Sequence, residues 1–144
     1  MRDYFLKNEN NKQIKESDFY IFRNLSKKGI GFFAETNNFY PDFILWVIDG
    51  KKQKIAFIDP KGLIHGPSEK IAKIEIGKTL KEVESKLKRK DIELTSFIVA
   101  GEDSSFEKIR GLAGINTKTK FEENHVIFQE DEDYIDKIIT RIIA

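Results

Sequence analysis

Two aspartates and a lysine stand at the ends of two strongly apolar stretches of the chain. Asp42 precedes the run FILWVI, while Asp59 and Lys61 close the run IAFIDPK and share one face of a strand that reaches that far. Two carboxylates that converge beside an apolar wall repel one another unless a cation lies between them. Oxygen ligands of this kind favour Mg²⁺ or Mn²⁺, and a nearby lysine can position water or neutralise charge that develops at phosphorus. The residue types therefore indicate metal-dependent hydrolysis of a phosphodiester.

A hairpin between the two apolar stretches is expected to bring the aspartates together. Asp49-Gly50 is the clearest turn signal in the sequence, and the strand before it should pair with residues 54–59. In that pairing Asp59 lies near Tyr40, two residues from Asp42, so both carboxylates stand at one end of the sheet. The exact loop length is ambiguous, which leaves open whether they share a face. The alternative is that both aspartates merely end strands and pair with lysines.

The remaining sequence predicts a single mixed α/β domain over residues 1–144. After a polar arm at 1–13, three strands within residues 30–61 are expected to form an antiparallel meander, and a long helix then leads to a buried strand. No internal repeat, low-complexity tract or linker divides the chain. The expected elements are helices at 17–28, 68–89, 106–112 and 134–143, and strands at 30–36, 39–48, 54–59, 94–100 and 125–129.

Composition favours a globular cytoplasmic protein and excludes several classes of site. The chain is 40% apolar and 34% charged, and it has no Cys, which excludes disulfides and thiolate metal sites. No run approaches the roughly 18 apolar residues of a membrane span, and no export signal follows Met1, so we expect no membrane partner. A P-loop motif is absent, two histidines are too few for a His-based metal cluster, and no G-x-S-x-G elbow occurs.

Charge is unevenly distributed along the chain. Residues 61–90 contain nine Lys or Arg against four Glu, whereas residues 121–144 contain two Lys or Arg against seven Asp or Glu. The basic segment is either the solvated side of a helix or a surface that lies along a polyanion. We interpret Trp46 and the many Phe residues of the apolar strands as core rather than as platforms for stacked bases. Candidate contacts to nucleic acid are His65, Lys70, Lys73 and Lys78.

Three phrases of the sequence resemble one nuclease superfamily. Pro41-Asp42, an apolar hairpin and then Asp59-Pro60-Lys61 resemble the motif that names the PD-(D/E)XK nucleases. More narrowly, RNLSKKGIGFF, NFYPDFILW and FIDPKGL resemble the nuclease-like C-terminal domains of type III restriction enzyme helicase subunits and related helicases. The likeness covers residues 20–65 and continues more weakly to residue 90. It implies a restriction-endonuclease-like mixed sheet with an α-β-β-β-α-β core, extended here by an additional strand and a C-terminal helix.

The resemblance implies a DNA endonuclease of a restriction or helicase–nuclease system that hydrolyses phosphodiester bonds with metal-activated water. It makes Asp42 and Asp59 ligands of Mg²⁺ (or Mn²⁺) and Lys61 the catalytic lysine. The implied partners are DNA and a helicase domain or subunit, and a homodimer is one arrangement that it allows. It also raises the hypothesis that the chain is a piece excised from a longer helicase-containing protein. The alternative function is a catalytically weak DNA-binding or helicase-coupling module with a nuclease fold.

A third acidic ligand has two candidates. Members of the superfamily often add a glutamate from the first helix, and Glu16 stands at the very start of the helix expected here. Glu35 is the rival, because it faces Tyr40 across the hairpin and shares a face with Asp42 if Asn37-Asn38 forms a two-residue turn. Either glutamate could instead be an exposed charge with no part in the site.

Overall fold

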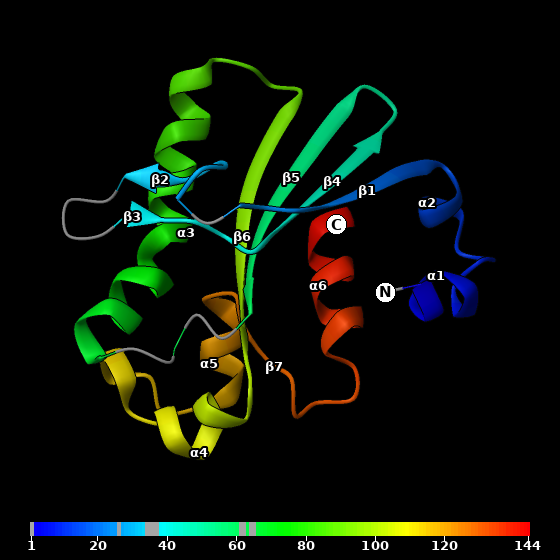
Figure 1. Ribbon diagram of the computed structural model, residues 1–144. Coiled ribbons are helices and arrows are strands. Elements are labelled where there is room, and N and C mark those ends of the chain that lie inside the picture. The colour runs from blue at the N-terminus through cyan, green and yellow to red at the C-terminus, as the bar shows by residue number, and fades with distance from the viewer. Residues whose placement is uncertain (1, 26, 34–37, 61–62, 64–65) are drawn as a thin grey trace.

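A computed structural model describes residues 2–25, 27–31, 39–60, 63 and 66–144, together with the backbone of residues 32, 33 and 38. Its centre is an open five-stranded sheet in the order β1-β4-β5-β6-β7, with a separate pair of short strands, β2 and β3, beside it (Figure 1). In chain order the described elements are α1 (Arg2–Lys7), α2 (Lys12–Lys15), β1 (Ser17–Arg23), β2 (Phe32–Phe33), β3 (Asn38–Phe39), β4 (Phe43–Asp49), β5 (Lys52–Pro60), α3 (Pro67–Leu87), β6 (Ile92–Ala100), the 3-10 turn η1 (Glu102–Ser104), α4 (Phe106–Ile109), the 3-10 turn η2 (Leu112–Gly114), α5 (Lys118–Glu123), β7 (Val126–Phe128) and α6 (Tyr134–Ile143).

The sheet combines an antiparallel half with a parallel half. Strands β1, β4 and β5 are antiparallel neighbours, whereas β5, β6 and β7 run parallel. The parallel pairing of β5 with β6 requires a crossover, and α3 supplies it. The mixed α/β class expected from the sequence is therefore confirmed. Among the described residues, none of the helices is both long enough and apolar enough to span a membrane.

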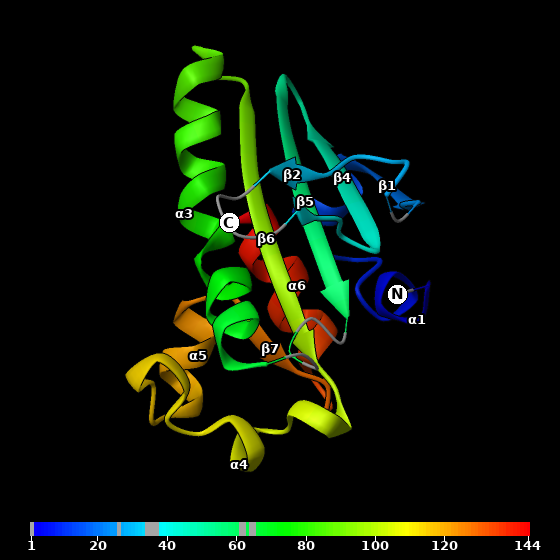
Figure 2. The same cartoon turned by 60° about the vertical axis from the view of Figure 1, so that its left-hand side comes forward.

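Helices cover both faces of the sheet. Figures 1 and 2 show α3 on one face and α6 on the other. Because alternate residues of the central strands face two different layers, both β4 and β5 are nearly continuous apolar runs. The core between the sheet and α3 includes Ile44, Phe57, Ile76, Leu80 and Leu94. The core between the sheet and α6 includes Leu45, Val47, Ala56, Ile58, Phe97, Ile138, Ile139 and Ile142.

The C-terminal end of α6 is fastened to the sheet by a buried lysine. Lys54 of β5 is 6% exposed, and its ammonium donates to the carbonyl oxygen of Ile143 at 3.1 Å. The side-chain amide of Gln13, from α2, donates to the same carbonyl. A cation at a helix C-terminus satisfies an orphan carbonyl and complements the helix dipole. This contact keeps α6 in place under the antiparallel strands.

The hairpin between β4 and β5 turns one residue later than the sequence suggested. Asp49 pairs with Lys52, so Gly50 and the residue after it form the loop. Gly50 has a φ of 59°, in the left-handed region that glycine adopts without steric cost. From there the register runs without a break to the pair of Phe43 with Ile58. This shift of one residue decides which side chains meet at the far end of the hairpin.

The helix predicted at residues 17–28 is wrong, because most of that segment is strand β1. All seven residues of β1 pair with β4, from Ser17 opposite Asp49 to Arg23 opposite Phe43. The first strand of the meander is therefore β1 rather than the predicted strand at 30–36. Of that segment, β2 pairs only with β3 in the separate two-stranded sheet, and residues 34–36 lie outside the described residues.

Most elements after residue 60 agree with the sequence prediction. The long helix, the strand after it and the strand expected at 125–129 correspond to α3, β6 and β7. The final helix begins and ends as predicted, at Tyr134 and Ile143. The brief helix expected at 106–112 is the shorter α4 followed by η2, and α5 was not predicted. Local apolar periodicity was sufficient for these elements, because each repeats its pattern over the whole of its length.

Candidate functional site

The register of β4 and β5 brings the two aspartates to the same end of the hairpin. Phe43 pairs with Ile58 as the last pair, Asp42 lies immediately before β4, and Asp59 follows Ile58, so a register continued by one residue sets Asp42 opposite Asp59. The pairing of β1 with β4 also continues by one residue, because the amide of Asn24 donates to the carbonyl of Asp42 at 2.7 Å. Residues opposite one another in an antiparallel pair lie on the same face. The sequence left open whether the two carboxylates share a face, and the register continued by one residue favours one face for both.

The two carboxylates differ sharply in exposure. Asp59 is 6% exposed and lies on the α3 side of the sheet, two residues after Phe57, whereas Asp42 is exposed. The ammonium of Lys73, from the second turn of α3, donates to Oδ2 of Asp59 at 3.0 Å. The same ammonium lies 6.0 Å from the ring centroid of buried Phe39. One carboxylate is thus fixed inside the protein while its neighbour faces solvent.

Lys73 is the member of the site that the sequence did not place there. It was a candidate contact to nucleic acid, but its ammonium instead meets a carboxylate of the aspartate pair. The crossover helix packs back on the sheet, so its first turns lie over the carboxyl end of the strand that it follows. That topology was a usable signal, since Lys73 follows Asp59 by only fourteen residues and the helix begins between them.

The other predicted site residues are distributed unevenly. Glu16 ends α2 beside the start of β1, is exposed, and forms an ion pair with Lys12 at 3.8 Å. That end of β1 pairs with Asp49, at the opposite end of β4 from the aspartate pair, so the structure does not bring Glu16 to the site. Lys70 is half-buried and Lys78 is exposed, both on α3. Three more predictions, Lys61, Glu35 and His65, lie outside the described residues.

Carboxylate oxygens suit a hard divalent cation, but two aspartates alone do not complete its coordination. Within the described part of the chain, no group of three or more His, Cys, Asp or Glu side chains could hold a metal ion. A six-coordinate ion here would need water, substrate oxygens or residues beyond that part for its other positions. The donor chemistry of Asp42 and Asp59 therefore fits Mg²⁺ or Mn²⁺, as part of a coordination shell.

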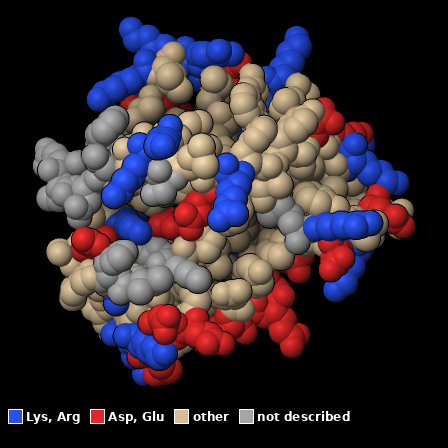
Figure 3. All heavy atoms as spheres, in the orientation of Figure 1, with Lys and Arg blue, Asp and Glu red and all other residues tan. Residues whose placement is uncertain are grey.

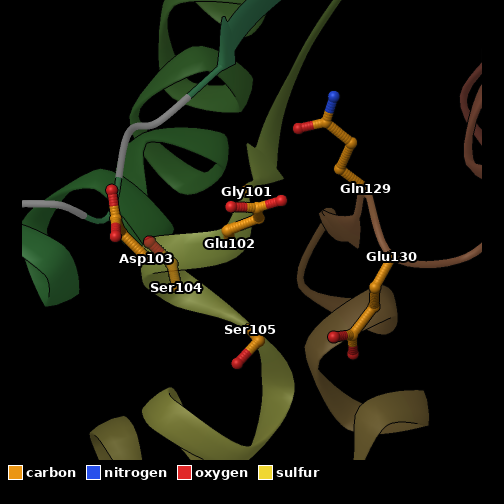
Figure 4. Close-up of a pocket in the computed structure, with 7 residues that line it drawn as sticks. All are labelled: Gly101, Glu102, Asp103, Ser104, Ser105, Gln129 and Glu130. Atoms are coloured by element: carbon orange, nitrogen blue, oxygen red, sulfur yellow. The ribbon is translucent and has the colours of Figure 1, made fainter.

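The edge that carries Asp59 also carries an acidic pocket. Since β5, β6 and β7 are parallel, their carboxyl ends reach the same edge of the sheet (Figure 2), which is where open α/β sheets place their ligand sites. A pocket of about 720 Å³ lies between the ends of β6 and β7. In Figure 4, Glu102, Gln129 and Glu130 point toward the space between the two strand ends. The pocket is lined by Gly101, Glu102, Asp103, Ser104, Ser105, Gln129 and Glu130.

Charge on the surface separates into regions. In the view of Figure 3, Lys and Arg side chains gather along the upper edge, acidic side chains gather along the lower edge, and a small acidic patch near the centre has basic side chains on both sides. A phosphate group would be repelled by the acidic pocket and would be attracted to cations that flank a carboxylate pair. The pair of aspartates is therefore a better candidate site for a polyanion than the acidic pocket between β6 and β7.

A second cluster of charges, around Asp131, is held together by ion pairs. The ammonium groups of Lys118 and Lys137 lie 2.9 and 2.8 Å from the two oxygens of Asp131. Burial alone would raise the pKa of the Asp131 carboxyl, but the hydrogen bonds from Lys137 and Lys118 lower it below its usual value. Hydrogen bonds from Asp131 and Glu122 raise the pKa of Lys137. This cluster joins α5, the β7–α6 loop and α6, and we interpret it as structural.

The arrangement of the aspartate pair permits one kind of chemistry above others. The site combines buried Asp59, the ammonium group that pairs with it and the exposed carboxylate of Asp42. Such a group of side chains can hold a divalent cation together with an anionic substrate. Asp59 belongs to β5, and Asp42 lies immediately before β4, where its backbone carbonyl accepts a hydrogen bond from the backbone amide of Asn24 at 2.7 Å. Comparison of the chain with protein-family models, with curated proteins and with solved structures finds no match.

Proposed function

We propose that this chain is a Mg²⁺-dependent DNA endonuclease with a PD-(D/E)XK fold. The observation that carries the proposal is the β4–β5 register, which ends at the pair of Phe43 with Ile58 and so brings Asp42 and Asp59 to the same end of the hairpin, at the carboxyl end of β5. Two carboxylates that end neighbouring strands repel one another unless cations lie beside them. Lys73 already pairs with Asp59, and a divalent ion held by both acids would relieve repulsion between the carboxylates.

The order of elements supports the same proposal. Three antiparallel strands, a crossover helix and a parallel strand follow short N-terminal helices, in the succession that the resemblance implies. The first three strands are β1, β4 and β5, so the two motif aspartates belong to the second and third strands of the meander. The additional strand β7 and the helix α6 correspond to the expected extension of this core.

Each residue of the pair has a distinct task in this proposal. Asp42 and Asp59 would hold Mg²⁺ or Mn²⁺, which supplies a more acidic bound water and polarises the phosphoryl group. Lys73 balances the charge of buried Asp59 and fixes the orientation of its carboxylate through the 3.0 Å contact. Exposed Asp42 faces the side from which substrate arrives. Lys61 is proposed as the cation that neutralises charge on the phosphate.

A second candidate function is a helicase-coupling module with little activity of its own. An apolar pocket of about 270 Å³ lies between the antiparallel strands and α6, with Ile21, Phe43 and Ile135 among its lining residues. Ile21 belongs to the edge strand β1 and is 52% exposed. Exposed apolar side chains of this kind favour a surface where another protein domain docks. The two candidates are compatible, since a coupled nuclease needs both a site and a docking surface.

A cleavage assay with a matched aspartate control tests the proposal. The purified chain is incubated with supercoiled and single-stranded DNA in Mg²⁺, Mn²⁺ or EDTA. Asp42→Asn and Asp59→Asn are each expected to lower the cleavage rate by about 100-fold or more, since each removes a direct ligand. Asp49→Asn, at the other end of β4, is expected to leave the rate unchanged, and EDTA to abolish cleavage.

Two outcomes would contradict the proposed nuclease activity. The first is that the wild type cuts neither DNA in either metal. The second is that Asp49→Asn reduces cleavage as much as the other two substitutions. Circular dichroism of every variant shows whether a lost activity reflects a lost fold. Failure of the wild type to cut would favour the coupling module, and the assay would then be repeated with a helicase partner present.

A further inference from the structure

Two aromatic side chains of the edge strand β1 are half exposed. Tyr20 is 49% exposed and Phe22 is 48% exposed, while most large apolar side chains of β4 and β5 are buried. β1 has a neighbour on one side only, because it is the first strand of the sheet. An exposed pair of aromatic rings on a soluble domain is unusual enough to suggest a binding surface.

The register puts these rings on the same face as the aspartate pair. Tyr20 pairs with Trp46, and Phe22 pairs with Ile44, which in turn pairs with Phe57. Ile44 and Phe57 belong to the layer under α3, on the side where Asp59 meets Lys73. Successive residues of one face are about 6.6 Å apart along a strand. Phe22 thus stands one such step from the row of Asp42 and Asp59, and Tyr20 stands two.

Basic side chains lie beside this row of rings. Lys27 and Lys28, in the turn that follows β1, are exposed and form no ion pair with the described residues. Asn24 fastens that turn, because its side-chain amide donates to the carbonyls of Ile30 at 2.6 Å and Pro41 at 2.9 Å. The turn with its cations is therefore held next to Asp42.

We propose that Tyr20 and Phe22 are a stacking platform for the bases of an unpaired nucleic-acid strand that leads to Asp42 and Asp59. Bases stack on aromatic side chains only when they are free of their own duplex, so the platform selects single-stranded or locally opened substrate. The cations Lys27 and Lys28 would contact the phosphates. This inference rests on the proposed function and extends it by naming the form of the substrate.

The two faces of β1 provide an unusually close control. Ile21 lies between the two aromatic residues, is equally exposed at 52%, and points to the opposite, α6 face, where it lines the apolar pocket. A substitution at Ile21 therefore changes the same strand and a similar apolar area without touching the proposed platform. Any effect that is specific to the aromatic face must come from the rings themselves.

The test is a binding measurement in EDTA, where no cleavage occurs. Fluorescence anisotropy gives the Kd for a labelled oligo-dT of about 15 nucleotides, which is long enough for one such surface, and for a duplex of the same length. We expect the double variant Tyr20→Ala, Phe22→Ala to raise the Kd for the single strand by about tenfold or more. The Kd for the duplex should change little, and Ile21→Ala should change neither.

Several results would overturn the platform. They are an equal loss of single-strand and duplex binding, an equal effect of Ile21→Ala, or no binding of oligo-dT by the wild type. Loss of self-association in the double variant without a change in either Kd would assign the surface to a protein contact instead. Thermal unfolding of each variant shows that the fold is retained, and Tyr20→Phe with Phe22→Tyr should restore binding.

The platform and the nuclease can fail separately. Asp42→Asn and Asp59→Asn should bind oligo-dT at least as tightly as the wild type in EDTA, because each removes a negative charge from the path of the strand and leaves the rings in place. Binding that depends on the aromatic rings without any metal-dependent cleavage would refute the nuclease and keep the platform. Cleavage that depends on the aspartates but does not change when Tyr20 and Phe22 are substituted would support the nuclease and refute the platform.

Discussion

Two aspartates at the carboxyl ends of parallel strands each meet a lysine, yet their surroundings differ. Asp59, near the end of β5, accepts a hydrogen bond from Lys73 at 3.0 Å and lies opposite a second carboxylate, Asp42. Asp131, just after β7, is held by two lysines at 2.8 and 2.9 Å. At the first site one lysine meets one of two neighbouring acids, whereas at the second two lysines bridge Asp131 and link it to further carboxylates.

The difference shows that an Asp–Lys contact does not by itself mark a site of chemistry. Lys137 also reaches Oε1 of Glu122 at 2.7 Å, so the charges around Asp131 match one another and tie three segments together. A divalent cation could enter there only by displacing an ammonium group. At the aspartate pair the same cation would relieve a repulsion. The site at Asp59 is therefore suited to ligand binding, and the site at Asp131 to stability.

The largest expected effect on stability is at the cluster around Asp131. Lys137→Met should lower the free energy of unfolding by about 1–3 kcal/mol, because it leaves two mostly buried carboxylates short of a partner. The loss should be the same in Mg²⁺ and in EDTA. Urea denaturation measures it, and Lys12→Gln, which removes an exposed ion pair of 3.8 Å, serves as a control with no measurable change.

A smaller and metal-dependent effect is expected at the aspartate pair. Lys73→Met should lower the free energy of unfolding by about 1–2 kcal/mol in EDTA, since Asp59 is buried and loses a charged partner. Millimolar Mn²⁺ should restore most of that loss by taking the place of the ammonium beside the carboxylates. A loss that Mn²⁺ does not reduce would show that both clusters are structural, and the contrast between them would disappear.

The smallest expected effect is a pH dependence at His125, which immediately precedes β7. Its ring stacks on Phe97 with centroids 4.8 Å apart, and burial, aided by the charges of Arg141 and Lys81, lowers the pKa of the imidazole despite a hydrogen bond to Ser96. Because the folded pKa lies below the unfolded pKa, this contribution to stability is present above the unfolded pKa of about 6.5 and is lost as the pH falls.

The comparison of wild type with His125→Asn isolates this titration. Asn tolerates the φ of 60° found at this position, so the backbone should be retained. The wild type should lose slightly more stability than the variant between neutral and mildly acidic pH, by less than either lysine substitution costs. Equal pH profiles in thermal unfolding would contradict the expectation and assign the titration to other groups.

Sequence patterns predicted best where an element's own residues decide its form. The stripe of isoleucines in α6 and the apolar run of β6 repeat along their whole length, and both elements lie where the sequence indicated. The turn at Gly50 was located to within one residue for a similar reason. The same local logic identified Asp42 and Asp59 as carboxylates that end neighbouring strands.

Prediction failed where pairing between distant segments decides the form. Phe19, Tyr20, Phe22 and Leu25 fit a helical spacing as well as a strand, and hydrogen bonding with β4 settles the choice in favour of the strand. Their half-exposed faces could not be inferred from the sequence, because exposure depends on β1 being the edge of the sheet. Glu16 was a candidate ligand because the resemblance implies a glutamate from the first helix, and it lies beside the end of β1 that is farther from the site.

The sequence by itself determined the mixed α/β class, the apolar strands with acids at their ends, and the types of residue available for phosphodiester chemistry. These follow from local periodicity and from the chemistry of single side chains. Only the tertiary structure decided that Asp42 faces Asp59, that Lys73 reaches the buried carboxylate, and that Tyr20 and Phe22 share their face. A one-residue change of register exchanges the two faces of a strand, and that choice depends on packing against α3 and α6 rather than on any local signal.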